Sequence, residues 1–215
     1  MTARLAAEFL GTLILVATVI GSGIMAENLS GGNVALALLA NAIATGAILY
    51  VIISALGDIS GAHFNPVVTA VMTARGEMTA PDAGLYILVQ ILGGLSGMVI
   101  AHLMFELNPV QLSETVRSGP AQFLSEVVAT CGLVMTIILG VRYKAHAVPA
   151  MVALYITAAY WFTASTSFAN PAVAIARTFT NTFSGIHYGD TGPFIIAQII
   201  GAFLALALCK ALIRE

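Results

Sequence analysis

Two stretches of the sequence decide how this chain folds: GAHFNPV at residues 61–67 and TSFANPA at residues 166–172. In each stretch an Asn-Pro pair is followed by a short apolar run. Asparagine is a favoured helix N-cap, because its side-chain oxygen accepts a hydrogen bond from an amide of the first turn. Proline fits the first helical position, where no amide donor is needed. The sequence therefore predicts two short helices that begin immediately after Asn65 and Asn170.

Both predicted helices are too short to cross a membrane. The short apolar segments that contain them extend from about Phe64 to Arg75 and from about Ala169 to Thr180. Each would be about 15 Å long at about 1.5 Å per residue, against a hydrocarbon core about 30 Å thick. Short apolar segments at matching places in two halves of a membrane protein point to a transport site. A third pair, Asn108-Pro109, is followed by polar residues, which indicates an ordinary turn.

The composition is typical of an integral membrane protein. Hydrophobic residues make up 59% of the 215 residues and charged residues only 8%, whereas soluble domains carry about 25% charged residues. Apolar runs of about 20 residues, the length that spans a bilayer, occur about six times. These runs cover approximately residues 5–25, 34–56, 83–105, 121–141, 147–164 and 192–213.

Charge and cysteine content exclude other classes of protein. The net charge of −2 provides no basic field for binding nucleic acid. Cys131 and Cys209 both lie in apolar runs and lack the spacing of a metal site or of a disulfide framework.

The sequence contains an internal repeat. AEFLGT at residues 7–12 resembles SEVVAT at residues 125–130, and YILVQILGG at residues 86–94 resembles FIIAQIIGA at residues 194–202. With the two Asn-Pro stretches between them, the matches occur in the same order. Three spans per half would turn the second copy upside down and bring both short helix starts, each with about half a positive charge, to the bilayer middle. We expect one domain, with repeat 1 at about 1–105, an outer loop at about 106–120 and repeat 2 at about 121–215.

Basic residues predict the orientation in the membrane, since they are enriched on the cytoplasmic side. If the N-terminus is cytoplasmic, only Arg117 and Arg177 of the eight basic residues lie outside. The six predicted to be inside are Arg4, Arg75, Arg142, Lys144, Lys210 and Arg214. Both termini are therefore expected in the cytoplasm, and the protein in a bacterial inner membrane.

These motifs resemble those of the aquaporin superfamily over the whole chain. That family has two Asn-Pro-Ala boxes in inverted repeats, a Glu in the first and fourth spans, and a His two residues before the first box. Asn65, Asn170, Glu8, Glu126 and His63 stand at those places. The resemblance implies an all-α fold of six transmembrane helices and two re-entrant half-helices. It also implies a passive channel for water and small neutral solutes, not an enzyme, without cofactor or metal, and usually a homotetramer.

The selectivity filter departs from the usual family pattern. Typical members place Arg directly after the second box, where this sequence has Val173, and the first box ends in Val67 in place of Ala. The family spacing assigns the rest of the filter to Thr45, Ala158 and Ser167. This Arg-less filter resembles that of bacterial aquaglyceroporins associated with arsenic resistance. The resemblance implies a wide mouth and, as cargo, glycerol-like polyols or uncharged metalloid hydroxides such as arsenous acid.

The resemblance and the repeat together assign further roles. The boxes that exclude ions and protons comprise Asn65, Pro66, Val67, Asn170, Pro171 and Ala172. Backbone expected to line the pore belongs to Gly61, Ala62, His63, Ser165 and Thr166. Acceptors and amides expected to support the loops are Glu8, Glu126, Gln90 and Gln198. Arg177 would either reach the outer vestibule in place of the missing Arg or extend towards water at its helix end, and we favour the latter.

Two alternative functions deserve a test. Glu8 and Glu126 are ionisable groups inside spans, which would suit a proton-coupled secondary transporter. Residues 94–97 have the Gly-x-Ser-Gly form of intramembrane serine proteases, with Ser96 as nucleophile. A protease needs a His base on a neighbouring span, and neither His102 nor His187 is suitably placed. The protease would also leave the repeat unexplained.

Overall fold

The computed structural model describes residues 1–213. In this range it contains eight α-helices and a short 3-10 turn, with no strand. The helices are α1 (Thr2–Leu29), α2 (Val34–Ser60), α3 (Pro66–Ala74), α4 (Ala80–Met104), α5 (Pro120–Tyr143), α6 (Val148–Phe162), α7 (Pro171–Thr178) and α8 (Tyr188–Leu212). Arg214, one of the residues predicted to be cytoplasmic, lies outside the described residues.

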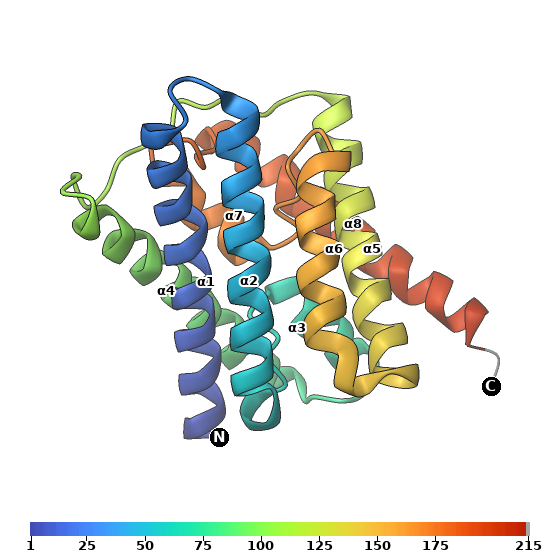
Figure 1. The fold of residues 1–215 in the computed structure, drawn as a ribbon. Coiled ribbons are helices and arrows are strands. Elements are labelled where there is room, and N and C mark those ends of the chain that lie inside the picture. Colours follow the sequence, from blue (N-terminus) through green and yellow to red (C-terminus); the bar gives the residue numbers. More distant parts are fainter. Residues whose placement is uncertain (214–215) are drawn as a thin grey trace.

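Six of these helices are long and apolar enough to cross a membrane: α1, α2, α4, α5, α8, and α6 together with its preceding turn. The predicted fold class is therefore confirmed. Most of the spans are longer than predicted, because polar caps and flanking residues continue the helices beyond the apolar runs. The first residues of α1 and the last residues of α8 lie at the same end of the bundle (Figure 1).

The helix starts follow local capping chemistry. Asn33 accepts a hydrogen bond from the amide of Leu36 at the start of α2, over 3.1 Å. Thr79 accepts one from the amide of Asp82 at the start of α4. Prolines stand in the first turn of α3, α4, α5, α6 and α7, where a missing amide hydrogen costs nothing. A polar cap, a first-turn proline or both thus mark the starts of α2, α3, α4, α5, α6 and α7.

The two halves of the chain pack in the same way. α1 packs against α4 and α2, while α5 packs in the same manner against α8 and α6, and α2 contacts α6 across the halves. Glycines permit the closest of these approaches: a Cβ atom on Gly93 would overlap the carbonyl oxygen of Phe9, and one on Gly201 that of Val127. Small residues of this kind let membrane helices approach closely.

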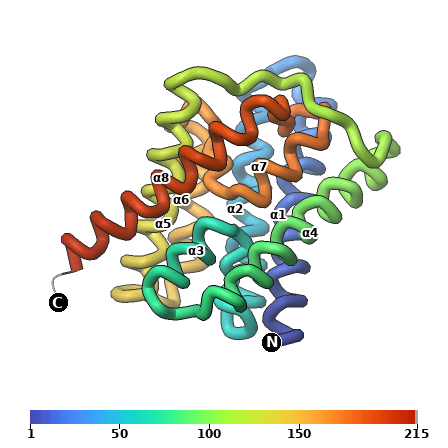
Figure 2. The backbone as a smooth tube through the Cα atoms, turned by 180° about the vertical axis from the view of Figure 1, so that it is seen from behind, coloured from blue at the N-terminus to red at the C-terminus, as the bar shows by residue number. Residues whose placement is uncertain are grey.

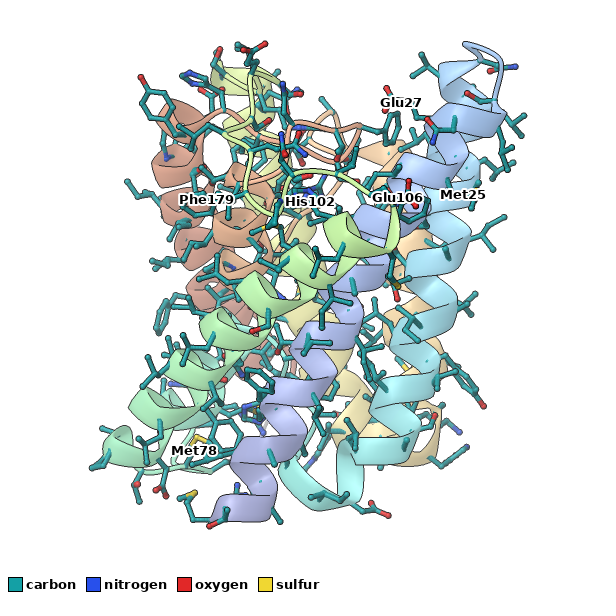
Figure 3. All side chains as sticks on the ribbon, turned by 90° about the vertical axis from the view of Figure 1, so that its left-hand side faces the viewer. Met25, Glu27, Met78, His102, Glu106 and Phe179 are labelled. Carbon is teal, nitrogen blue, oxygen red and sulfur yellow. The ribbon has the colours of Figure 1, made fainter. Side chains whose placement is uncertain are left out.

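The half-helices α3 and α7 lie inside the bundle and contact each other. α3 packs against α4 and α8, and α7 packs against α8 and α4. Figure 2 shows α7 in the upper half of the molecule and α3 in the lower half. Phe179, at the end of α7, and Met78, beyond the end of α3, lie towards opposite ends of the molecule (Figure 3). The helix starts face each other in the middle.

Candidate pore and selectivity filter

The two Asn-Pro boxes meet and hold each other in place. The Asn65 side-chain oxygen accepts from the amide of Val67 over 3.1 Å, and that of Asn170 accepts from the amide of Ala172 over 3.0 Å. The Asn65 amide nitrogen donates to the Ala169 carbonyl over 2.7 Å, and the Asn170 amide nitrogen donates to the Phe64 carbonyl over 2.8 Å. One hydrogen of each amide group is therefore used across the repeat, and one is left for the cavity.

Both asparagines line an elongated cavity of about 250 Å³ that passes between the halves. Towards the α3 end its wall is mostly apolar, with Leu49, Met72 and Ile137 among the lining residues, and Glu77 borders it beyond the end of α3. Towards the α7 end the wall combines Val173 with polar groups. Non-helical backbone within the membrane is tolerated where it is buried in protein or lines a watery path, and the segments before both boxes meet this condition.

Glu8 holds the loop before the first box. One carboxylate oxygen accepts from the Ser60 hydroxyl over 2.7 Å and from the His63 amide over 2.9 Å. The other accepts from the Phe64 amide over 2.7 Å and from the Gln90 side chain over 2.8 Å. Glu8 is fully buried, and its four hydrogen bonds satisfy both oxygens.

Glu126 makes the same set of bonds in the second half. Its carboxylate accepts from the Ser165 hydroxyl over 2.6 Å and from the Phe168 amide over 2.9 Å. It also accepts from the Ala169 amide over 2.9 Å and from the Gln198 side chain over 2.6 Å. Partners at matched positions in the repeat thus occupy all the bonds of both carboxylates, which leaves no free acceptor for a proton relay.

These bonds stabilise an unusual backbone. Ala62, Phe64, Ser167 and Ala169 have φ between 47° and 51°, the left-handed region that residues other than glycine rarely adopt. Ala62 matches Ser167 in the repeat, and Phe64 matches Ala169. Such conformations persist where the surroundings fix them, and they occur preferentially at ligand-contacting sites. The carboxylate bonds to neighbouring amides supply that constraint here.

The loop residues contribute unequally to the cavity. Gly61, Ala62 and His63 line it as expected, and so does Ser167. Ser165 and Thr166 are not among the lining residues. Ser165 instead turns its hydroxyl towards Glu126, so the cavity wall on the α7 side begins two residues later than expected.

On α6, the residue that lines the cavity is not the one that the sequence predicted. Ala158 is exposed on the outside of the helix and does not line the cavity, whereas Tyr160 is buried and does. The Tyr160 hydroxyl lies 3.2 Å from that of Thr45, which also lines the cavity. Thr45, Ser167 and Val173 line it as predicted. The sequence did contain the signal: Val148, Val152, Ile156 and Tyr160 recur every four residues and share the cavity-facing side of α6.

Arg177 does not extend towards water, and this favoured interpretation of the sequence was wrong. It is only 2% exposed and lines the cavity one turn beyond Val173. Its Nε donates to the carbonyl of Ser184, and its guanidinium carbon lies 3.4 Å from the centre of the Phe168 ring. The segment that follows α7 folds back over the helix end and shields the side chain from solvent.

Sequence reasoning missed a second arginine at this end. Arg117, in the loop between α4 and α5, donates to the Gly185 carbonyl over 2.8 Å, and its guanidinium carbon lies 5.2 Å from the centre of the Phe168 ring. Burial lowers the pKa of Arg117 from its ordinary value. The loop is held down by bonds such as that from the Ser113 amide to the Thr178 carbonyl. No local pattern reveals this contact, because it joins residues far apart in the chain.

Comparison with known proteins identifies the class of protein that this fold and cavity define. Residues 1–163 match the model of the major intrinsic protein family. The chain belongs to this family.

The relatives agree with that assignment. The chain is 58% identical over 214 residues to aquaglyceroporin AqpS of Rhizobium meliloti (strain 1021), covering 100% of this chain and 91% of the relative. It is 30% identical over 209 residues to a probable NIP-type aquaporin of Nicotiana alata, covering 94% and 76%. Its fold is similar to that of the aquaglyceroporin from Plasmodium falciparum, with a TM-score of 0.77 at 20% identity over 96% of this chain and 94% of that chain. The protein is therefore a passive membrane channel for water and small solutes, and neither the transporter nor the protease alternative is supported.

Proposed function

We propose that the channel conducts small uncharged hydroxylated solutes, glycerol-like polyols and metalloid hydroxides such as arsenous acid, in addition to water. The observation that carries this proposal is the composition of the cavity wall beyond the second box. Val173 is apolar and lines the cavity directly, where an arginine would narrow it. Hydroxyl groups of Thr45 and Tyr160 provide hydrogen-bonding partners on the facing helices.

Selection would proceed in two stages along the cavity. The filter of Thr45, Tyr160, Ser167 and Val173 admits polar solutes of moderate size. At Asn65 and Asn170 each solute oxygen then meets one free amide hydrogen from either side. The positive ends of α3 and α7 oppose cations and protons at the same place.

Glu8 and Glu126, with Gln90 and Gln198, support this geometry without joining the path. None of the four is among the residues that line the cavity. Their bonds keep the loop carbonyls of Gly61 to His63 and the Ser167 hydroxyl at the wall.

A solute panel in proteoliposomes tests the proposal. Water, glycerol, urea and arsenous acid are presented in osmotic or radiolabel assays, with empty liposomes as the control. We expect glycerol and arsenous acid to enter well above the control rate without a proton gradient. A channel that passes water alone would contradict the proposed solutes.

Val173→Arg tests the filter itself. A long cationic side chain at this position should narrow the cavity, reducing glycerol and arsenous acid uptake at least about tenfold while sparing water. Val173→Ile keeps the wall apolar and serves as the matched control. Equal glycerol uptake by the arginine variant and the unmodified channel would show that the filter lies elsewhere.

We also propose a homotetramer in a bacterial inner membrane with both termini in the cytoplasm. The start of α1 and the end of α8 lie at the same end of the bundle, which supports placing both termini on one side of the membrane (Figure 1). Large exposed apolar residues on α2 and α6, among them Leu39, Ile43, Leu154 and Trp161, need lipid or another subunit to cover them. Native mass spectrometry from mild detergent would measure the number of subunits.

A further inference from the structure

A buried arginine without an acidic partner faces the cavity at its α7 end. Arg177 is 2% exposed, and within residues 1–213 the only ion pair joins Arg75 and Glu77 at the surface. The only side-chain hydrogen bond of Arg177 in this range leaves from Nε to the Ser184 carbonyl. Its terminal guanidinium nitrogens therefore remain available on the side where the residue borders the cavity.

No carboxylate forms an ion pair with this charge in residues 1–213. The Arg177 guanidinium lies against the Phe168 ring, whose other neighbours include the Phe194 ring at 5.1 Å and the Arg117 guanidinium at 5.2 Å. An aromatic face attracts a cation but carries no net charge. Arg117 adds a second positive charge, and its own acceptors are backbone carbonyls, those of Gly185 and Phe183.

A second polar group without a partner borders the same part of the cavity. The hydroxyl oxygen of Ser167 is buried and has no hydrogen-bond partner in the described residues, yet Ser167 lines the cavity. Buried polar groups in native proteins nearly always have partners, protein or otherwise. The Ser167 hydroxyl and the terminal guanidinium nitrogens of Arg177, which lack such partners, indicate that the passing solute or water supplies them.

We propose that Arg177 is the charge-selective residue of this channel: it repels cations and donates hydrogen bonds to solute oxygens from a position one helical turn, about 6 Å at about 1.5 Å per residue, beyond Val173. Arg177 would thus supply the cation barrier that an arginine at position 173 provides in typical family members. The wall beside the second box stays apolar and wide because position 173 is a valine. The proposal deepens the proposed function, since it explains how a wide mouth for neutral solutes excludes ions.

Cation leak through charge variants tests the proposal. Arg177→Lys keeps the charge and Arg177→Gln removes it, while Arg142→Gln removes an exposed charge at the end of α5 and is the matched control. In proteoliposomes with a potassium gradient and a pH-sensitive dye, we expect at least about tenfold more cation leak for Arg177→Gln. The lysine and control variants should stay within about twofold of the unmodified channel. The proposal would be overturned if Arg177→Gln conducted water without increased cation leak. It would also be overturned if Arg177→Lys leaked cations as fast as Arg177→Gln.

A third variant gives a test within one folded protein. Histidine is charged only at a pH below its ordinary pKa of about 6.5, or lower when it is buried. Arg177→His should therefore be tight at about pH 4.5 and leaky at about pH 8, whereas the unmodified channel should remain tight at both. A leak independent of pH would contradict the role of charge, even if Arg177→Gln failed to fold. Water flux shows whether each variant is folded. The test of Arg177 therefore remains valid even if the channel fails to conduct glycerol and arsenous acid.

Discussion

At the scale of single residues, Glu8 and Glu126 show why an ionisable group inside a span need not carry protons. Each is fully buried, and each accepts four hydrogen bonds from matched donors. Removing an acceptor from such a network leaves buried donors unpaired, which costs more than the net value of the bonds themselves. The two carboxylates thus hold the loops that precede the two Asn-Pro boxes.

Glu8→Gln should destabilise the protein while leaving solute passage free of any proton dependence. The amide that replaces one oxygen would face two donors, at about 1–3 kcal/mol for each donor left unpaired. We expect the unfolding temperature in detergent to fall by more than about 5 °C. Glu27→Gln, at an exposed position of the same helix α1, should change it little. An unchanged unfolding temperature for Glu8→Gln would contradict the proposal that Glu8 supports the loop.

At the scale of helices, the sequence predicted what local chemistry determines and failed where contacts are distant. The starts of α3 and α7 were predictable because Asn65 and Asn170 cap their own helices. The cavity-lining position on α6 was misplaced because spacing counted across a loop does not follow the rotation of the helix. Tyr160, not Ala158, faces the cavity. The burial of Arg177 was unpredictable from its neighbours, since the segment that covers it folds back from beyond α7.

Helix packing in both halves depends on glycines at matched positions. Gly93→Ala or Gly201→Ala would place a Cβ atom against a backbone carbonyl of the adjacent helix, where no side chain can move aside. Such overpacking costs about 1–3 kcal/mol, so both variants should unfold at lower temperature. Gly84→Ala, in α4 with open space around it, should stabilise by about 0.5–1 kcal/mol. Equal thermal stability of all three variants in detergent would contradict the close packing of α1 on α4 and of α5 on α8.

At the scale of the whole molecule, the two halves are joined by the boxes themselves. Asn65 donates to the loop of the second half and Asn170 to the loop of the first, so neither half completes its pore wall alone. α2 also packs against α6, α4 against α7 and α3 against α8 across the halves. The inverted arrangement sends the loop at residues 105–119 and the turn at residues 144–147 to opposite ends of the bundle (Figure 1). The orientation of the channel is therefore known once the membrane side of one of these connections is determined.

Cysteine labelling from one side of the membrane locates both connections. Ser118 and Lys144 are exposed in these two connections, and the native Cys131 and Cys209 are buried. With the two native cysteines replaced by alanine, Ser118→Cys should react with a membrane-impermeant maleimide in intact spheroplasts. Lys144→Cys should react only after permeabilisation, because Arg142 and Lys144 favour the cytoplasmic side. The reverse labelling pattern would show that the channel has the opposite orientation, with Arg177 at the cytoplasmic mouth. Labelling of both cysteines in intact spheroplasts would contradict the six-span topology.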